Sequence, residues 1–133
     1  MGRRWWFWPL AGFLTAAVLG TLAHFVYRWS GGALLAGVFC AANESVWEHM
    51  KLLFFPVLLL TAAQFCMGER DGLLAARAVS VTAGLALIPT LYYTYTGIWG
   101  DHVLWADAAI FYLSAAVTFW LDDLLHRQRR LWK

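Results

Sequence analysis

Residues 33–66 decide the fold, and they read ALLAGVFCAANESVWEHMKLLFFPVLLLTAAQFC. Two apolar runs, at 34–42 and 52–66, flank a polar nonapeptide, NESVWEHMK at 43–51. About 20 helical residues are needed to cross a hydrocarbon layer of about 30 Å, because a helix rises 1.5 Å per residue. The stretch is therefore too long for one crossing, and the nonapeptide interrupts it too much for two.

The energetic cost of buried charge favours placing the nonapeptide at one end of a crossing. A charge at the centre of a membrane helix costs roughly 2.5–3.5 kcal/mol, whereas each Leu, Ile, Phe or Val returns only about 0.3–0.6 kcal/mol. A crossing over 41–61 would hold three charges at its centre, at about 8–10 kcal/mol. We therefore predict a crossing over 46–66, preceded by a short outer segment at 33–43 that is a half-helix or a re-entrant segment.

The rest of the chain is equally apolar. Of its 133 residues, 62% are hydrophobic and only 14% are charged, which is too little polar surface for a soluble domain. Hydropathy marks three further crossings, at about 5–27, 73–96 and 98–121. The sequence thus predicts a single all-α domain over 1–133, an integral membrane bundle of four helices.

The distribution of basic residues predicts the orientation. If both termini are cytoplasmic, that side carries eight cations, namely Arg3, Arg4, Arg70, Arg77, Arg127, Arg129, Arg130 and Lys133. Arg28 lies on the other side, and Lys51 lies within the second segment. Cytoplasmic loops carry the excess of Lys and Arg, so we expect a multi-pass protein of the bacterial inner membrane, surrounded by lipid bilayer. No nucleic-acid motif accompanies these charges, so we expect no nucleic-acid partner.

Two stripes should face protein rather than lipid. Gly12, Ala16 and Gly20 follow one another at four-residue spacing, which lets another helix approach closely. In the last crossing, Asp107, Ser114 and Thr118 share one helix face.

Local structure explains only part of the nonapeptide. Ser45 and Glu48 match the capping box S-x-x-E, in which each side chain bonds a free amide at the start of a helix. A buried carboxylate–lysine pair involving Lys51 is a second structural interpretation. Neither accounts for Glu44 and His49.

The predicted topology gathers acidic and imidazole side chains in the outer half of the bilayer. The candidate cation- or proton-binding residues are Glu44, Glu48, His49, Asp101, His102 and Asp107. The residues expected to supply supporting hydrogen bonds are Asn43, Ser45, Lys51 and Tyr93. Ionisable residues at membrane depth usually mark ion pathways, proton relays or ligand sites. Whether His24 joins this cluster stays open.

The bound cation is a proton or a divalent metal ion. Carboxylate oxygens and imidazole nitrogens are suitable ligands for Zn²⁺, Mn²⁺ or Fe²⁺. The candidate ligands are Glu44, Glu48, His49 and Asp107, although their spacing matches no established metal motif. The same groups can bind and release protons, because burial makes a carboxylate easier to protonate and histidine titrates near neutrality.

The string NESVWEHMKLLFFP at 43–56 resembles the signature N-E-S-x-W-E-H-x-K of an uncharacterised family of small bacterial multi-pass membrane proteins. A weaker second match is Tyr-Tyr-x-Tyr-x-Gly at 92–97, followed by the segment with Asp107. The resemblance implies a shared core around the nonapeptide but no activity.

Three functions are compatible with this sequence. The first is a small transporter or channel-like protein that binds a proton or a metal ion at the cluster. One copy has little room for a pore, so a homodimer is expected. The second is an intramembrane enzyme that acts on a lipid-like substrate with paired carboxylates and a histidine. The third is an accessory or scaffold subunit of a membrane complex.

Overall fold

The structure, a computed structural model, describes residues 7–43, 45–69 and 71–131. In this part of the chain the helices are α1 (Phe7–Trp29), α2 (Leu34–Phe39), α3 (Val46–Cys66), α4 (Leu73–Trp99) and α5 (Leu104–Leu131), with no strand. Four of them, α1, α3, α4 and α5, are long and apolar enough to cross a membrane. The predicted all-α fold with four long apolar helices is confirmed.

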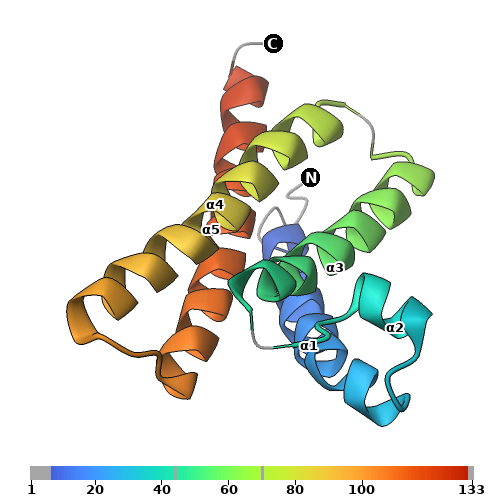
Figure 1. Ribbon diagram of the computed structural model, residues 1–133. Coiled ribbons are helices and arrows are strands. Elements are labelled where there is room, and N and C mark those ends of the chain that lie inside the picture. The colour runs from blue at the N-terminus through green and yellow to red at the C-terminus, as the bar shows by residue number, and fades with distance from the viewer. Residues whose placement is uncertain (1–6, 44, 70, 132–133) are drawn as a thin grey trace.

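The four long helices form a bundle in which each packs mainly against two of the others. α3 packs against α1 and α4, and α5 packs against α4 and α1. Successive long helices run in opposite directions (Figure 1). We call the end where α1 and α4 finish and α3 and α5 begin the His49 end. The opposite end, where α4 begins, is the Arg77 end.

The small-residue stripe of α1 lies against other helices, as the sequence predicts. Gly12, Ala16 and Gly20 are buried. A Cβ atom on Gly20 would come within 2.9 Å of the backbone oxygen of Leu52 in α3 and 2.5 Å of the Phe111 ring in α5. Glycine therefore lets α1 approach both neighbours at this level of the bundle.

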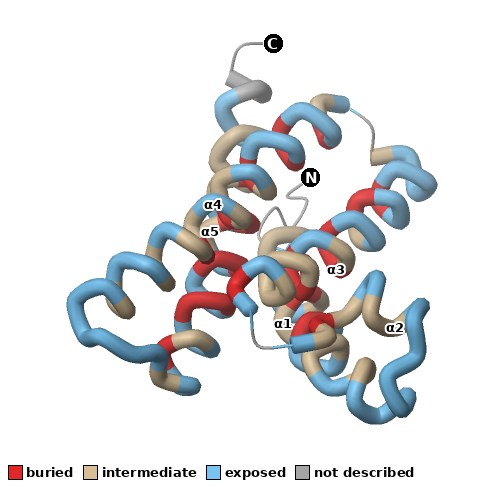
Figure 2. The backbone as a smooth tube through the Cα atoms, in the orientation of Figure 1, coloured by how far each residue is buried: buried red, intermediate tan, exposed pale blue. Residues whose placement is uncertain are grey.

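The outward faces of the bundle are apolar. Buried residues follow the inner sides of the helices, and the outer sides are left uncovered by the rest of the chain (Figure 2). Large apolar side chains are among the uncovered residues, such as Val18 at 57%, Leu59 at 63% and Val79 at 54% exposure. Apolar surface of this extent is unfavourable in water and favourable against lipid acyl chains.

Only half of the predicted capping box is present at the start of α3. Ser45 is the N-cap, and its Oγ accepts a hydrogen bond from Glu48 N at 3.3 Å. The reciprocal hydrogen bond, in which Ser45 N would donate to the Glu48 carboxylate, does not form. Asn43 Oδ1 accepts from Ser45 N at 2.8 Å, and Glu48 Oε2 accepts from Ala42 N at 2.9 Å. Because Asn43 satisfies the cap amide, the Glu48 carboxylate can bond further back along the chain.

The cap makes a first testable prediction. Replacing Ser45 with Ala should lower the free energy of unfolding by about 1 kcal/mol, because the amide of Glu48 loses its acceptor. Replacing Ser45 with Asp keeps a side-chain acceptor and should change it by only a few tenths of a kcal/mol. The unfolding midpoint of each variant in sodium dodecyl sulfate, monitored by tryptophan fluorescence, measures these changes in stability. Equal losses in the two variants would contradict the capping role.

Candidate functional site

A small cavity lies between α3, α4 and α5 at the His49 end. Its volume is about 20 Å³, which is enough for about one water molecule. The lining residues are Val46, His49, Ile88, Tyr92, Asp107, Ile110 and Phe111. Three of them carry polar groups, and each comes from a different helix: His49 from α3, Tyr92 from α4 and Asp107 from α5. The structure thus brings two of the predicted site residues, His49 and Asp107, to one cavity.

Asp107 is the most connected side chain of this site. It lies in the first turn of α5, where the helix dipole favours a carboxylate. Its Oδ1 accepts a hydrogen bond from the Tyr95 hydroxyl, and its Oδ2 lies 3.2 Å from His102 Nδ1. The Tyr95 hydroxyl accepts in turn from Val103 N at 3.1 Å. The Asp107 side chain is 18% exposed and that of His102 is 54% exposed, so the histidine lies on the solvent side of the carboxylate.

Two imidazole rings meet on the α1–α3 side of the cavity. His49 Nδ1 lies 2.8 Å from Ser45 O. A carbonyl oxygen only accepts, so Nδ1 carries the hydrogen and Nε2 of the neutral ring is the nitrogen that gains a proton. The His24 ring of α1 lies 5.3 Å from the His49 ring, measured between centroids. His24, which the sequence left unassigned, therefore adjoins the site through His49.

Glu48 and Lys51 hold the segment before α3 instead of lining the cavity. Lys51 Nζ lies 2.5 Å from Glu48 Oε2 and donates to Gly37 O in α2 at 2.7 Å. Glu48 also accepts from Ala42 N. Adjacent residues point about 100° apart on a helix, so Glu48 faces α2 when His49 faces the cavity. These two charges satisfy backbone groups that would otherwise face an apolar environment.

The other predicted residues have separate positions. Asp101 is exposed, and its Oδ1 accepts from His102 N at 2.7 Å. Tyr93 is 55% exposed, and Tyr95, two positions further along α4, bonds Asp107 instead. Two helical positions turn a side chain by about 200°, so the two tyrosines occupy opposite faces. Glu44 lies outside the described residues.

The donors described at this site are too few for a typical metal centre. Among residues 7–43, 45–69 and 71–131, no group of three or more His, Cys, Asp or Glu side chains could hold a metal ion. Protein zinc sites use three or four protein ligands. Of the four proposed metal ligands, His49 and Asp107 line the cavity and Glu48 is paired with Lys51.

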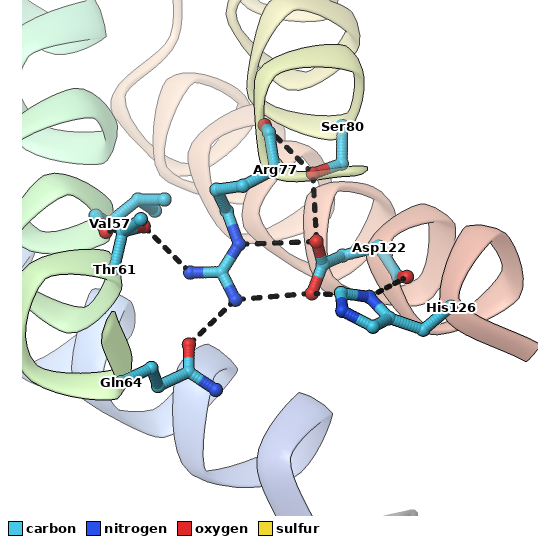
Figure 3. Close-up of polar contacts among 7 residues, drawn as sticks. All are labelled: Val57, Thr61, Gln64, Arg77, Ser80, Asp122 and His126. Carbon is cyan, nitrogen blue, oxygen red and sulfur yellow. Dashed lines mark hydrogen bonds and ion pairs between the residues drawn. The ribbon is translucent and has the colours of Figure 1, made fainter. Parts of the chain in front are cut away.

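A second polar cluster lies at the Arg77 end, and the sequence reasoning missed it (Figure 3). Arg77 and Asp122 are only 5% and 7% exposed. Arg77 Nε donates to Asp122 Oδ1 at 3.2 Å, and one terminal nitrogen donates to Oδ2 at 3.1 Å. Arg77 also donates to Thr61 Oγ1 at 2.9 Å and to Gln64 Oε1 at 2.8 Å, both on α3. The cluster therefore joins α3, α4 and α5 through one guanidinium.

A sequence signal for this cluster did exist. Asp122 follows Thr118 by four residues and so continues the stripe of Asp107, Ser114 and Thr118 by one turn. Ser114 and Thr118 are fully buried, as expected of a stripe that faces protein. Arg77 was interpreted instead as one of the cations at the membrane surface.

The fold and the two polar clusters define a class of protein: a multi-pass helical membrane protein with ionisable groups buried between its helices. The chain belongs to a family of unknown function (DUF6512), whose model matches residues 3–128. This agrees with the predicted membership of an uncharacterised family. No curated protein and no solved structure matches the chain.

Proposed function

We propose that this protein is a small membrane transporter or channel-like protein that binds a proton at the His49–Asp107 site. One observation carries the proposal: a histidine and an aspartate from different helices line the same water-sized cavity. Asp107 has an exposed histidine, His102, on its solvent side. A proton can therefore pass from solvent through an imidazole to a carboxylate and on to a second imidazole, either directly or through a water molecule.

A proton suits this site better than a divalent metal ion. Asp107 already accepts hydrogen bonds from Tyr95 and His102, which occupy part of its coordinating capacity. The cavity of about 20 Å³ accommodates about one water molecule, which can carry a proton between polar groups. We accordingly assign the cation of this proposal as a proton.

The orientation is part of the same proposal. Arg77 no longer counts among the loop cations, because it is buried and paired with Asp122. The remaining cations on the side of the termini are Arg3, Arg4, Arg70, Arg127, Arg129, Arg130 and Lys133, against Arg28 on the other side. This bias still favours cytoplasmic termini and a bacterial inner membrane. The His49 site then faces the extracytoplasmic side, with 33–43 as a re-entrant segment there.

A homodimer completes the proposal. The described cavity holds about one water molecule, so one bundle has little space for a permeating solute. A path between two copies would leave each core packed and place each site beside the interface. Crosslinking in native membranes tests this arrangement, and a purely monomeric species would contradict it.

Asp107→Asn should abolish proton uptake by vesicles that contain the purified protein. The amide cannot take up a proton, although it can keep hydrogen bonds to Tyr95 and His102. A pH-sensitive dye inside the vesicles measures the initial rate under an imposed pH gradient and a potassium diffusion potential. We expect a reduction of at least tenfold.

Asp123→Asn is the matched control for this experiment. Asp123 also lies on α5, and its side chain is 17% exposed, compared with 18% for Asp107. Its carboxylate pairs with Arg127 at 2.7 Å, at the other end of the bundle. Uptake should be unchanged in this variant. Equal rates in the wild type and Asp107→Asn, or no uptake by the wild type, would overturn the proposed function.

A further inference from the structure

α5 carries a second aspartate–histidine pair near its other end. Asp122 and His126 lie at the Arg77 end, and Asp107 and His102 lie at the His49 end. Fifteen residues separate the two aspartates, or about 22 Å along a helix axis, which is most of a hydrocarbon layer of about 30 Å. In both pairs the histidine side chain is the more exposed partner: 33% against 10% for His126 and Asp122, and 54% against 18% for His102 and Asp107.

The contacts of His126 identify Nε2 as the basic nitrogen of its neutral ring. His126 Nδ1 lies 3.0 Å from Asp122 O, one helical turn earlier. Nδ1 therefore donates its hydrogen to this carbonyl, and Nε2 is the basic nitrogen of the neutral ring. Asp122 Oδ2 lies 3.9 Å from Nδ1, close enough for its negative charge to stabilise the imidazolium that forms on protonation.

Charged and polar neighbours surround the Asp122 carboxylate. On α4, the Arg77 guanidinium donates two hydrogen bonds to the carboxylate, and Ser80 Oγ lies 3.5 Å from Oδ1. On α3, Thr61 and Gln64 bond the same guanidinium and carry no charge. The part of α1 near this end, residues 7–22, has no ionisable side chain. On α5 itself, Asp123 and Arg127 neutralise each other at 2.7 Å.

Polar atoms continue from Asp122 toward the middle of the bundle. Ser80, Thr118 and Ser114 are fully buried at the α4–α5 contact. Thr118 Oγ1 donates to Ser114 O at 2.8 Å. Ser114 Oγ has no hydrogen-bond partner within the described residues, although it is fully buried. A buried hydroxyl without a partner is costly, and a water molecule or a passing proton carrier would satisfy it. Ile110, one helical turn before Ser114, and Phe111 line the cavity at the His49 end.

We infer that His126 and Asp122 form a second proton-exchange site, at the end of the bundle opposite the His49–Asp107 site. A proton from solvent binds Nε2 of the neutral His126 ring, and the Asp122 carboxylate stabilises the imidazolium without itself being protonated. The part that this site plays in transport rests on the proposed function, whereas proton binding at His126 does not.

Histidine-selective ¹⁵N nuclear magnetic resonance of the full chain in detergent tests the site directly. The four histidines are distinguished by single His→Gln variants. The His126 ring should bind a proton at Nε2, which its ¹⁵N shifts report as the pH is lowered. Asp122→Asn should change the titration of His126 more than the matched Asp123→Asn does, because the Asp122 carboxylate lies next to the ring. A His126 ring that stays neutral down to pH 5, or equal shifts in the two variants, would overturn the inference.

A second variant covers the case in which Asp122→Asn does not fold. The double variant Arg77→Gln/Asp122→Asn removes both members of the ion pair and leaves no unpaired charge. The carboxylate lies between the guanidinium and the imidazole in Figure 3, so its loss should dominate at His126. The titration of His126 should again differ from that of the wild type by more than it does in Asp123→Asn. An unchanged titration would overturn the inference.

Proton uptake by vesicles tests the connection with transport. His126→Gln should slow uptake at least tenfold, and the matched variant Arg127→Gln, one residue further along α5, should leave it unchanged. If vesicles with the wild-type protein show no proton uptake, the proposed function is wrong. The resonance titration then still decides whether His126 and Asp122 bind a proton. An active His126→Gln variant would overturn the part of the inference that connects this site with transport.

Discussion

Asp122→Leu should lower the free energy of unfolding by about 3–5 kcal/mol, and adding Arg77→Met to the same chain should largely restore it. The single variant leaves a guanidinium that is 5% exposed without its counter-charge. Removing one partner of a buried ion pair typically costs about 3–5 kcal/mol, a large fraction of a stability of about 5–15 kcal/mol. The double variant buries apolar side chains of similar volume and should lie within about 1 kcal/mol of the wild type. Unfolding in sodium dodecyl sulfate, monitored by tryptophan fluorescence, gives the four values of this double-mutant cycle.

The less buried pair of Asp123 and Arg127 is the control for the cycle. These residues lie next to the buried cluster on α5, and their side chains are 17% and 48% exposed. Asp123→Leu, Arg127→Met and the double variant should each change the free energy of unfolding by less than about 1 kcal/mol. If the double variant of Arg77 and Asp122 is as unstable as the less stable of its two single variants, the cluster contributes more to stability than compensation of charge.

Gly84→Leu should have the second large effect, a loss of about 3 kcal/mol or more in the free energy of unfolding. Gly84 lies where α4 meets α5. A Cβ atom at this position would overlap the Thr118 hydroxyl and come within 3.2 Å of the Ser114 backbone oxygen. A leucine therefore forces the two helices apart and disturbs both Thr118 and Ser114. Denaturant midpoints and monodispersity in detergent measure this loss.

Gly97→Leu is the matched control, since Gly97 lies on the same helix and a Cβ atom there would meet nothing within 4 Å. This variant should keep or raise stability, because leucine favours helix more than glycine does. Gly84→Ala should be milder than Gly84→Leu, and adding Thr118→Ala should recover part of its loss by removing the hydroxyl. If Gly84→Leu and Gly97→Leu are equally stable, the contact between α4 and α5 is looser than the structure indicates.

Local sequence was sufficient for the main elements of this fold. A membrane-spanning helix requires about 20 consecutive apolar residues, which is a property of one segment and not of its neighbours. Ser45 similarly marks the start of α3, because an N-cap bonds an amide only three residues away. The partner of Glu48 was not predictable in the same way. Its carboxylate had three amide or ammonium groups within reach along the chain, and only the path of 37–42 decided among them.

The candidate site was partly accessible to sequence reasoning. Equal depth in the membrane suggested that His49 and Asp107 meet, and the structure places both at one cavity. Depth does not specify the direction of a side chain around its helix, however. For that reason Tyr93 was chosen where Tyr95 bonds Asp107, and Glu48 was grouped with residues it does not face. A rotation of 100° per residue makes such assignments sensitive to the packing of each helix.

Length, hydropathy and capping were thus enough to establish four apolar helices and the start of α3, since each depends on neighbouring residues alone. The role of Arg77 required the packed bundle. Its partner Asp122 lies 45 residues away, and its other acceptors lie 13 and 16 residues away on α3. A basic residue near a helix end is equally compatible with a lipid headgroup and with a buried carboxylate. Only the packing of α3, α4 and α5 around one guanidinium excludes water from it and makes the ion pair with Asp122 necessary.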